Sequence, residues 1–283
     1  MTTINNFSPA RFWAVTTRDA SLNWKTHLAH LLEFAGTLLA GLLIIIISAN
    51  TNEYTSSFVS IADRFYSWFA LVLTIGGMIA ASTVLKPISD KPGSIEFLTL
   101  PATNVEKFLS RVTIVTIGFA LSALASLVAV GALYYLLAAI FGLDAYGSLT
   151  FYCLTELFTP AQAVSATQML ESPTREVWCW QGALITYGFL ACMQSTFMLG
   201  GSVWRRFPLV KTLGVVVALA IILPPILVHF SYHPQTRSEF VATYPTILAV
   251  TGSILLTIAI INWLLSYWLF TRKQVVEIKK HRL

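Results

Sequence analysis

Charged residues are scarce in this chain. Asp, Glu, Lys and Arg make up 11% of its 283 residues, whereas 56% are hydrophobic. A soluble globular protein carries about 25% charged residues. The composition therefore excludes an ordinary soluble domain and predicts an all-α integral membrane protein.

The sequence also lacks the motifs of common enzymes. No glycine-rich loop ends in Lys-Ser or Lys-Thr, which excludes ATP binding by that route. Neither a paired-histidine zinc motif nor a Gly-x-Ser-x-Gly elbow occurs. We therefore expect no catalytic residue, no bound cofactor and no metal site in this chain.

Two histidine groups keep a metal-dependent membrane enzyme open as an alternative. His27, His30 and Glu33 are spaced by threes, and His229 and His233 lie about one helical turn apart. Imidazole and carboxylate are good metal ligands. Polar side chains at the membrane boundary give the same pattern, and we favour that interpretation.

Cysteine is rare as well. Cys153 and Cys179 fall on the same predicted side of the membrane, where a disulfide is possible in an oxidising compartment, and Cys192 falls within a span. We favour unpaired cysteines in an apolar setting. A secretory signal is not expected, because about thirty residues precede the first apolar run.

Long apolar runs are abundant by contrast. A bilayer needs about 20 apolar residues per helix, and six runs meet this requirement. They are His30–Ala49, Phe65–Leu85, Val112–Phe141, Gly182–Val203, Thr212–Phe230 and Thr246–Phe270. A further stretch, Thr150–Leu170, contains Glu156 and Pro160, and we predict an interfacial or re-entrant helix there.

Basic residues are distributed unevenly between the loops. Three of the 18 Lys and Arg residues fall on one side: Arg64, Arg175 and Arg237. The other fifteen fall on the side that holds both termini. Cytoplasmic loops hold the excess of Lys and Arg, so we predict cytoplasmic termini and residence in the cell inner membrane. The net charge of +5 then implies contact with anionic lipids, not nucleic acid.

The chain forms one predicted membrane domain, 1–283. Residues 1–29 precede the first span, and Ser8-Pro9 is a helix start in which Ser caps and Pro takes the first helical position. Trp and Arg alternate after it, which favours an amphipathic helix in the headgroup layer; an ordinary cytosolic tail is the alternative. Residues 142–181 form an outer-side segment, and 271–283 a basic tail.

The loop 86–111 carries the clearest local signals. Ser94 can cap a short helix that Pro101 ends. Thr103 and Glu106 then form a capping box, which starts a helix that continues into the third span. Two well-defined short helices on the cytoplasmic side predict contact with a soluble partner.

The string LTLPATNVEKFLSR, Leu98–Arg111, together with the N-terminal amphipathic helix and six spans, resembles the permease subunit of a type-2 ABC exporter. In such permeases the N-terminal helix is an elbow helix, and the loop after the second span carries a coupling helix that docks on a soluble ATPase subunit. The resemblance implies ATPase-coupling roles for Glu96, Phe97, Leu98, Leu100, Pro101, Glu106, Lys107 and Phe108.

The resemblance also implies a homodimer or heterodimer of permeases, driven by ATP hydrolysis in the separate subunit. The chain departs from the family where its outer segment lies between the third and fourth spans, not the last two. The span centres hold few charges, which counts against an ion-coupled transporter; Gln194 and Asn262 are interpreted as contacts between helices. A non-transporting scaffold or sensor that recruits a different soluble partner is the alternative.

Overall fold

The computed structural model describes residues 7–51, 57–85, 99–143, 146–158, 180–204, 206–231 and 237–280. All regular structure in these ranges is helical, which confirms the all-α fold class. The helices are α1 (Pro9–Leu22), α2 (Trp24–Asn50), α3 (Phe58–Ser82), α6 (Asn104–Thr113), the π-helical turn η2 (Ile114–Gly118), α7 (Phe119–Phe141), α8 (Leu149–Phe158), α9 (Trp180–Val203), α10 (Pro208–Ser231) and α11 (Arg237–Lys280).

Five of the described helices are long and apolar enough to cross a membrane. They are Trp24–Asn50, Phe58–Ser82, Asn104–Phe141, Trp180–Val203 and Ala249–Arg272. Helix α10 covers the predicted span Thr212–Phe230, but its described apolar part, Pro208–Ile222, is shorter than a bilayer requires. The described residues thus hold five candidate spans, and the sixth stays a prediction. The described part of helix α8, Leu149–Phe158, is an apolar helix at the start of the stretch Thr150–Leu170, whose remainder lies outside the described residues.

The surface of the helices is apolar. Ile44, Ile140 and Leu264 are each at least 64% exposed, and many other large apolar side chains are about half exposed. Contiguous exposed apolar surface of this extent is unfavourable in water. A lipid environment removes that cost, so the surface supports a multi-pass membrane protein.

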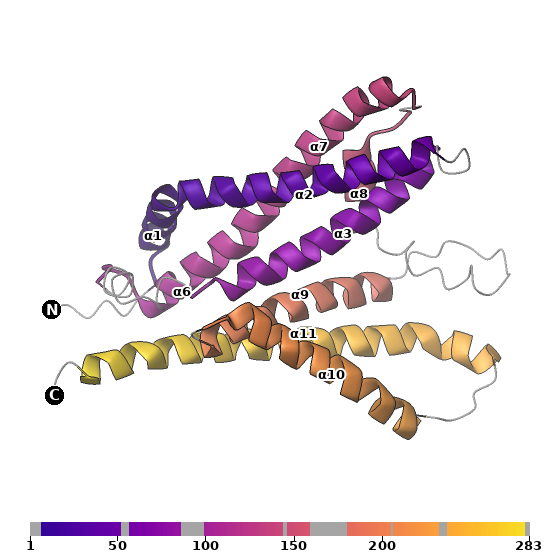
Figure 1. Cartoon of the computed structure of the whole chain (residues 1–283). Coiled ribbons are helices and arrows are strands. Elements are labelled where there is room, and N and C mark those ends of the chain that lie inside the picture. The colour runs from indigo at the N-terminus through magenta and orange to yellow at the C-terminus, as the bar shows by residue number, and fades with distance from the viewer. Residues whose placement is uncertain are drawn as a thin grey trace.

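The helices form two groups (Figure 1). In the first, α2 packs against α3 and α7, and α8 covers α3 and α7 at one end. In the second, α9 packs along α11 and against α10. Helix α3 contacts α9 and α10, while α6 contacts α11, so these two elements join the groups.

Polar side chains connect the helices inside the bundle. The Asn262 amide of α11 donates to the hydroxyls of Ser195 and Thr196 on α9, at 3.3 and 3.1 Å. Gln194 of α9 donates to Thr116 of the π-helical turn at 2.7 Å. The interpretation of Asn262 and Gln194 as contacts between helices is confirmed.

Close backbone approach also joins the two groups. A Cβ atom on Gly201 of α9 would lie 2.5 Å from the carbonyl oxygen of Ser82 at the end of α3. Real Cβ atoms do not approach a backbone oxygen so closely, so only glycine fits there. A Cβ atom on Gly36 or on Gly214, by contrast, would have open space around it, with no neighbouring atom within 4 Å.

We predict that Gly201→Ala destabilises the protein by about 1–3 kcal/mol, the usual cost of overpacking, because the α3 backbone must move. Thermal unfolding in mild detergent measures this. Gly36→Ala and Gly214→Ala are the matched controls and should be neutral or stabilising, since alanine favours a helix more than glycine does. An unfolding temperature of Gly201→Ala equal to that of the controls would contradict the α3–α9 packing.

Candidate coupling site and the adjacent cavity

Glu106 in the first turn of α6 is fully buried and joins α6 to α1. Its carboxylate accepts hydrogen bonds from the backbone amides of Ser8 at 2.6 Å and Thr103 at 2.7 Å. The Arg11 guanidinium donates to both oxygens, at 3.0 and 3.3 Å. A buried carboxylate is tolerated when charge-assisted hydrogen bonds satisfy its oxygens, as they do here.

Helices α1 and α6 begin where the sequence predicts, but the predicted capping interaction is present only in α6. The Thr103 hydroxyl accepts from the Glu106 amide at 3.2 Å, so the capping box is present. Helix α1 begins at Pro9 as expected, but the Ser8 hydroxyl makes no cap hydrogen bond with the described residues. The Ser8 amide is instead held by Glu106, a residue 98 positions later in the chain.

Two further contacts extend the α1–α6 interface beyond Glu106. The Thr16 hydroxyl donates to Ser110 at 3.1 Å, and Arg111 pairs with Asp19 at 2.8 Å. Burial raises the pKa of Asp19 above its ordinary value, although the nearby Arg111 lowers it. We call this set of contacts, from Glu106 to the Asp19–Arg111 pair, the α1–α6 clamp.

Lys107 and Phe108 of α6 are also buried. Lys107 is 4% exposed, and Phe108 is 6% exposed. The Phe108 ring contacts the rings of Tyr267 and Phe270 on α11, with centroids 5.4 and 5.6 Å apart. Phe108 also belongs to an apolar cluster with residues at the end of α3 and on α9, while α6 as a whole contacts α1 and α11.

The eight residues with implied coupling roles occupy different environments. Glu96, Phe97 and Leu98 lie outside the described residues. Pro101 is exposed and Leu100 is half-buried against the apolar cluster of Phe108. Glu106, Lys107 and Phe108 are covered by the chain itself. Their part in ATPase coupling stays a prediction.

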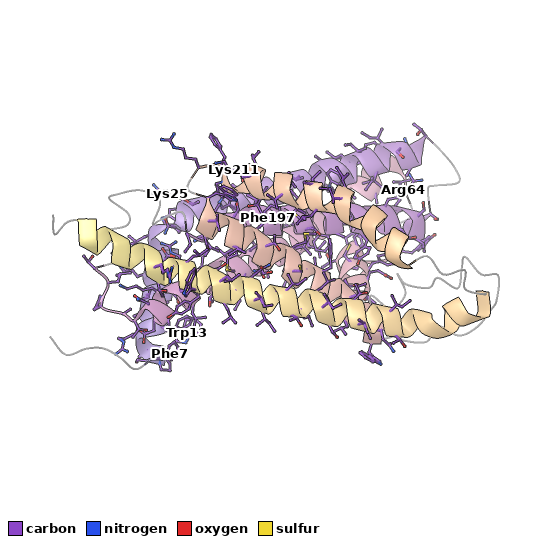
Figure 2. The ribbon with its side chains drawn as sticks, turned by 90° about the horizontal axis from the view of Figure 1, so that it is seen from below. Phe7, Trp13, Lys25, Arg64, Phe197 and Lys211 are labelled. Carbon is purple, nitrogen blue, oxygen red and sulfur yellow. The ribbon has the colours of Figure 1, made fainter. Side chains whose placement is uncertain are left out.

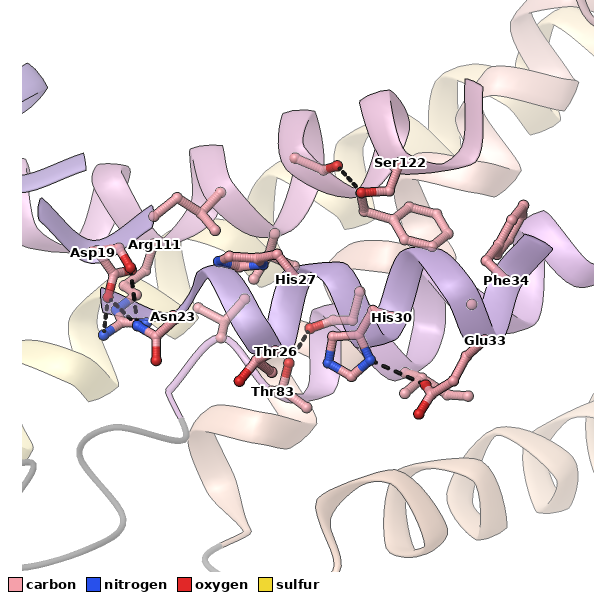
Figure 3. A pocket seen from close by; sticks show the side chains of 18 of the residues that line it. Asp19, Asn23, Thr26, His27, His30, Glu33, Phe34, Thr83, Arg111 and Ser122 are labelled. Atoms are coloured by element: carbon pink, nitrogen blue, oxygen red, sulfur yellow. Dashed lines mark hydrogen bonds and ion pairs between the residues drawn. The ribbon is translucent and has the colours of Figure 1, made fainter. Parts of the chain in front are cut away.

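A cavity of about 780 Å³ lies beside the clamp, between α2, α3 and the α6–η2–α7 helix. One end is lined by the polar residues Asp19, His27 and Arg111 (Figure 3). The other end is lined by apolar residues of α3, among them Val72, and by Phe34 of α2 together with the polar Glu33 and Thr37. The π-helical turn η2 contributes to the wall, and such turns are frequent at functional sites.

The polar end of the cavity contains buried polar atoms that need partners. Neither Asp19 Oδ2 nor His27 Nε2 has a hydrogen-bond partner within the described part of the chain, although both atoms are buried. Asp19 as a whole is only 9% exposed. Buried polar groups in native proteins are normally paired, so these two atoms are exceptions within the described residues.

The histidine groups do not form a metal centre in the described ranges. His30 Nδ1 lies 3.2 Å from Glu33 Oε2, and both side chains are more than half exposed. No group of three or more His, Cys, Asp or Glu residues in those ranges could hold a metal. The side chains of His229 and His233 lie outside the described residues. Cys179 does too, so a disulfide between it and the buried Cys153 stays an untested alternative.

Sequence reasoning missed the partners of Glu106 and the cavity. Arg11, Thr16 and Asp19 were assigned only to an amphipathic segment, although their spacing places all three on one face of α1, toward α6. The signal that could have found them is the pair of opposite charges, Arg11 and Asp19, on an otherwise amphipathic helix.

In comparisons with known proteins, no family model, no curated protein and no solved structure matches the chain. Functional inference therefore depends on the residues and contacts described above.

We predict that Glu106→Ala releases α1 from α6. The change removes the acceptor of two amides and of the Arg11 guanidinium, and losing hydrogen bonds to a charged group costs about 1.5–3 kcal/mol each. Hydrogen exchange of residues 9–22 in the purified protein should accelerate at least about tenfold. Glu33→Ala, which removes a carboxylate that is 74% exposed, is the control. Unchanged exchange in Glu106→Ala would show that the clamp does not hold α1.

Proposed function

We propose that the chain is the membrane-spanning permease subunit of an ATP-driven transporter of the type-2 ABC exporter class. A separate soluble ATPase binds the loop 86–111 and supplies the energy. The observation that carries the proposal is the position of α6, most of which belongs to that loop. Helix α6 contacts α1 and α11, and its Phe108 belongs to an apolar cluster with residues of α3 and α9. A displacement of the loop would therefore reach both helix groups.

The contacts of α6 suit the transmission of such a displacement. On one side, the clamp connects α6 to α1 through charge-assisted hydrogen bonds. On the other, Phe108 packs against aromatic rings of α11. Close-packed interfaces switch between discrete arrangements and do not deform continuously. Binding energy gained at the loop can thus shift the populations of two packings of the bundle.

Aromatic and basic residues mark a membrane boundary at the α1 end of the bundle. Trp is enriched at membrane interfaces, and long basic side chains extend there toward headgroups. Three cations lie over tryptophan rings: Lys25 over Trp24 at 6.0 Å, Lys211 over Trp204 at 5.0 Å and Arg272 over Trp268 at 3.8 Å. This boundary supports a cytoplasmic assignment of the end at which the ATPase would bind.

Figure 2 shows Lys25 and Lys211 toward one end of the molecule and Arg64 at the other. The predicted side with many Lys and Arg residues thus corresponds to the end with Lys25 and Lys211, and the predicted side with few corresponds to the end with Arg64. Trp13, on the exposed side of α1, is 59% exposed at the first end. An exposed Trp beside basic residues is typical of a helix that lies in the headgroup layer, which supports an elbow-helix role for α1.

The first test is co-purification with a soluble ATPase from mild detergent. Changing Phe97 and Leu98 together to Asp should abolish that association, because charged residues are disfavoured at the centre of an apolar interface. Membrane insertion should stay intact. Tyr146→Asp, at a residue 86% exposed between α7 and α8, is the control and should retain the ATPase.

Retention of the ATPase by the double variant would refute the assignment of the coupling loop. Co-purification of a soluble partner that does not hydrolyse ATP would favour the scaffold alternative over a transporter.

The second test concerns orientation. In a chain whose three cysteines are replaced by Ser, we predict that a membrane-impermeant maleimide labels Arg64→Cys on intact cells. Lys211→Cys should be labelled only after the membrane is opened, because the basic end faces the cytoplasm. The reverse pattern of labelling would place the predicted coupling loop outside and contradict the proposed function.

A further inference from the structure

The turn between α9 and α10 presents an exposed aromatic side chain at the basic end of the molecule. Phe207, the residue directly before α10, is 74% exposed, and Val210 in the first turn of that helix is 62% exposed. Arg206 and Lys211 flank these two residues in the sequence and are exposed as well. We call these four side chains, two apolar and two basic, the turn patch.

The backbone at Phe207 is unfavourable for a residue of this type. Its φ is 53°, in the left-handed region that a bulky L residue rarely adopts. Its carbonyl oxygen accepts the Lys211 amide at 3.2 Å, so Phe207 takes the cap position of α10, where small polar residues or glycine are preferred. Residues that break local rules in this way occur mainly where function requires them. The position therefore points to a function of the Phe207 side chain itself.

The ring of Phe207 lies at the water-facing edge of the membrane boundary. Lys211 lies over the Trp204 ring at 5.0 Å, and this pair marks the headgroup level at the basic end. Phe207 precedes Lys211 by four residues, so it lies about 6 Å farther out along α10 at 1.5 Å per residue. The headgroup layer is only about 5–8 Å thick on each side of a bilayer. The ring therefore faces water unless a protein covers it.

The same end of the molecule carries the predicted coupling loop. Leu100 of that loop and Leu209 of α10 both pack against the apolar cluster of Phe108. Pro101 follows Leu100 directly and is exposed, and the exposed Phe207 lies two residues before Leu209. A partner that covers the loop can therefore also cover the turn patch. This continuity identifies the occupant of the turn patch as the partner of the loop.

We propose that the turn patch is a second contact of the soluble ATPase that binds the predicted coupling loop. Phe207 inserts into an apolar pocket of the ATPase, because aromatic rings at the centre of an interface supply much of its binding energy. Arg206 and Lys211 face acidic side chains at the rim of that pocket, since interfaces are electrostatically complementary. The inference rests on the proposed function and extends the ATPase-binding surface from α6 to the second helix group.

Photo-crosslinking tests whether the loop and the turn share one partner. In cells that make the full-length protein, a photo-reactive amino acid replaces Pro101, Phe207 or Tyr146, one at a time, and mass spectrometry identifies what each position captures. We expect the same soluble ATPase from Pro101 and from Phe207. Tyr146, which is 86% exposed between α7 and α8, is the control and should capture no ATPase.

The possible outcomes separate this inference from the proposed function. Capture of the ATPase from Pro101 alone would overturn the turn patch as a contact and leave the proposed function in place. Lipid captured at Phe207, without the ATPase, would identify the turn as a membrane anchor. Capture from Phe207 alone would refute the coupling loop and the shared surface, and capture from neither position would overturn both proposals.

Phe207→Gly separates a binding role from a structural one. Glycine adopts the left-handed backbone without strain, so the unfolding temperature in mild detergent should be unchanged or higher. The affinity for the captured ATPase should fall about tenfold or more, as is typical when an aromatic ring is removed from the centre of an interface. Ile221→Ala is the control, because Ile221 is 68% exposed on α10 but about 20 Å farther along the helix.

The control should bind the ATPase like the unmodified protein. Unchanged affinity of Phe207→Gly would overturn the insertion of this ring into the ATPase. A parallel fall of affinity and unfolding temperature would show that Phe207 acts on the fold of the turn and not on the partner.

Arg206→Glu tests the acidic rim of the pocket. Charges at the rim of an interface act mainly on the association rate, and salt screens them. The affinity of this variant for the captured ATPase should fall several-fold at low ionic strength, and the difference from the unmodified protein should disappear in about 1 M salt. Equal affinities at low ionic strength, or a difference that salt leaves unchanged, would contradict an acidic rim.

Discussion

The buried carboxylate of Glu106 is the constraint on which the α1 end of this protein depends. A charge that is removed from water must be paired and hydrogen-bonded, or its burial is strongly destabilising. Here the requirement is met by one guanidinium and by two backbone amides, one on each side of the contact between α1 and α6. The position of α1 therefore follows from the need to satisfy one side chain of another helix.

Several features of the structure follow from this arrangement. Because α1 is held along α6, Asp19 reaches Arg111, and this pair closes the polar end of the cavity. Because α6 continues through η2 into α7, the same helix that carries the clamp also lines the apolar part of the cavity. The clamp, the π-helical turn and the cavity thus form one connected region, in which movement of α6 would change the shape of the cavity wall.

The two proposals concern one surface at the α1 end of the molecule. The permease proposal uses the contacts by which α6 connects the loop 86–111 to both helix groups. The turn patch extends that surface to the start of α10, because Leu100 of the loop and Leu209 of α10 pack against one apolar cluster. A partner that holds both the loop and the turn would move the two helix groups together, since α6 belongs to the first contact and α10 to the second.

Composition and hydrophobic periodicity determined the class of the protein, since lipid allows a spanning helix only where about 20 apolar residues satisfy their own backbone hydrogen bonds. The capping box at Thr103 and Glu106 was also readable, because its partners lie three residues apart. Tertiary structure alone decided that Glu106 binds Ser8 and Arg11, nearly a hundred residues away. The cavity was decided in the same way, because no local pattern specifies which distant helices meet.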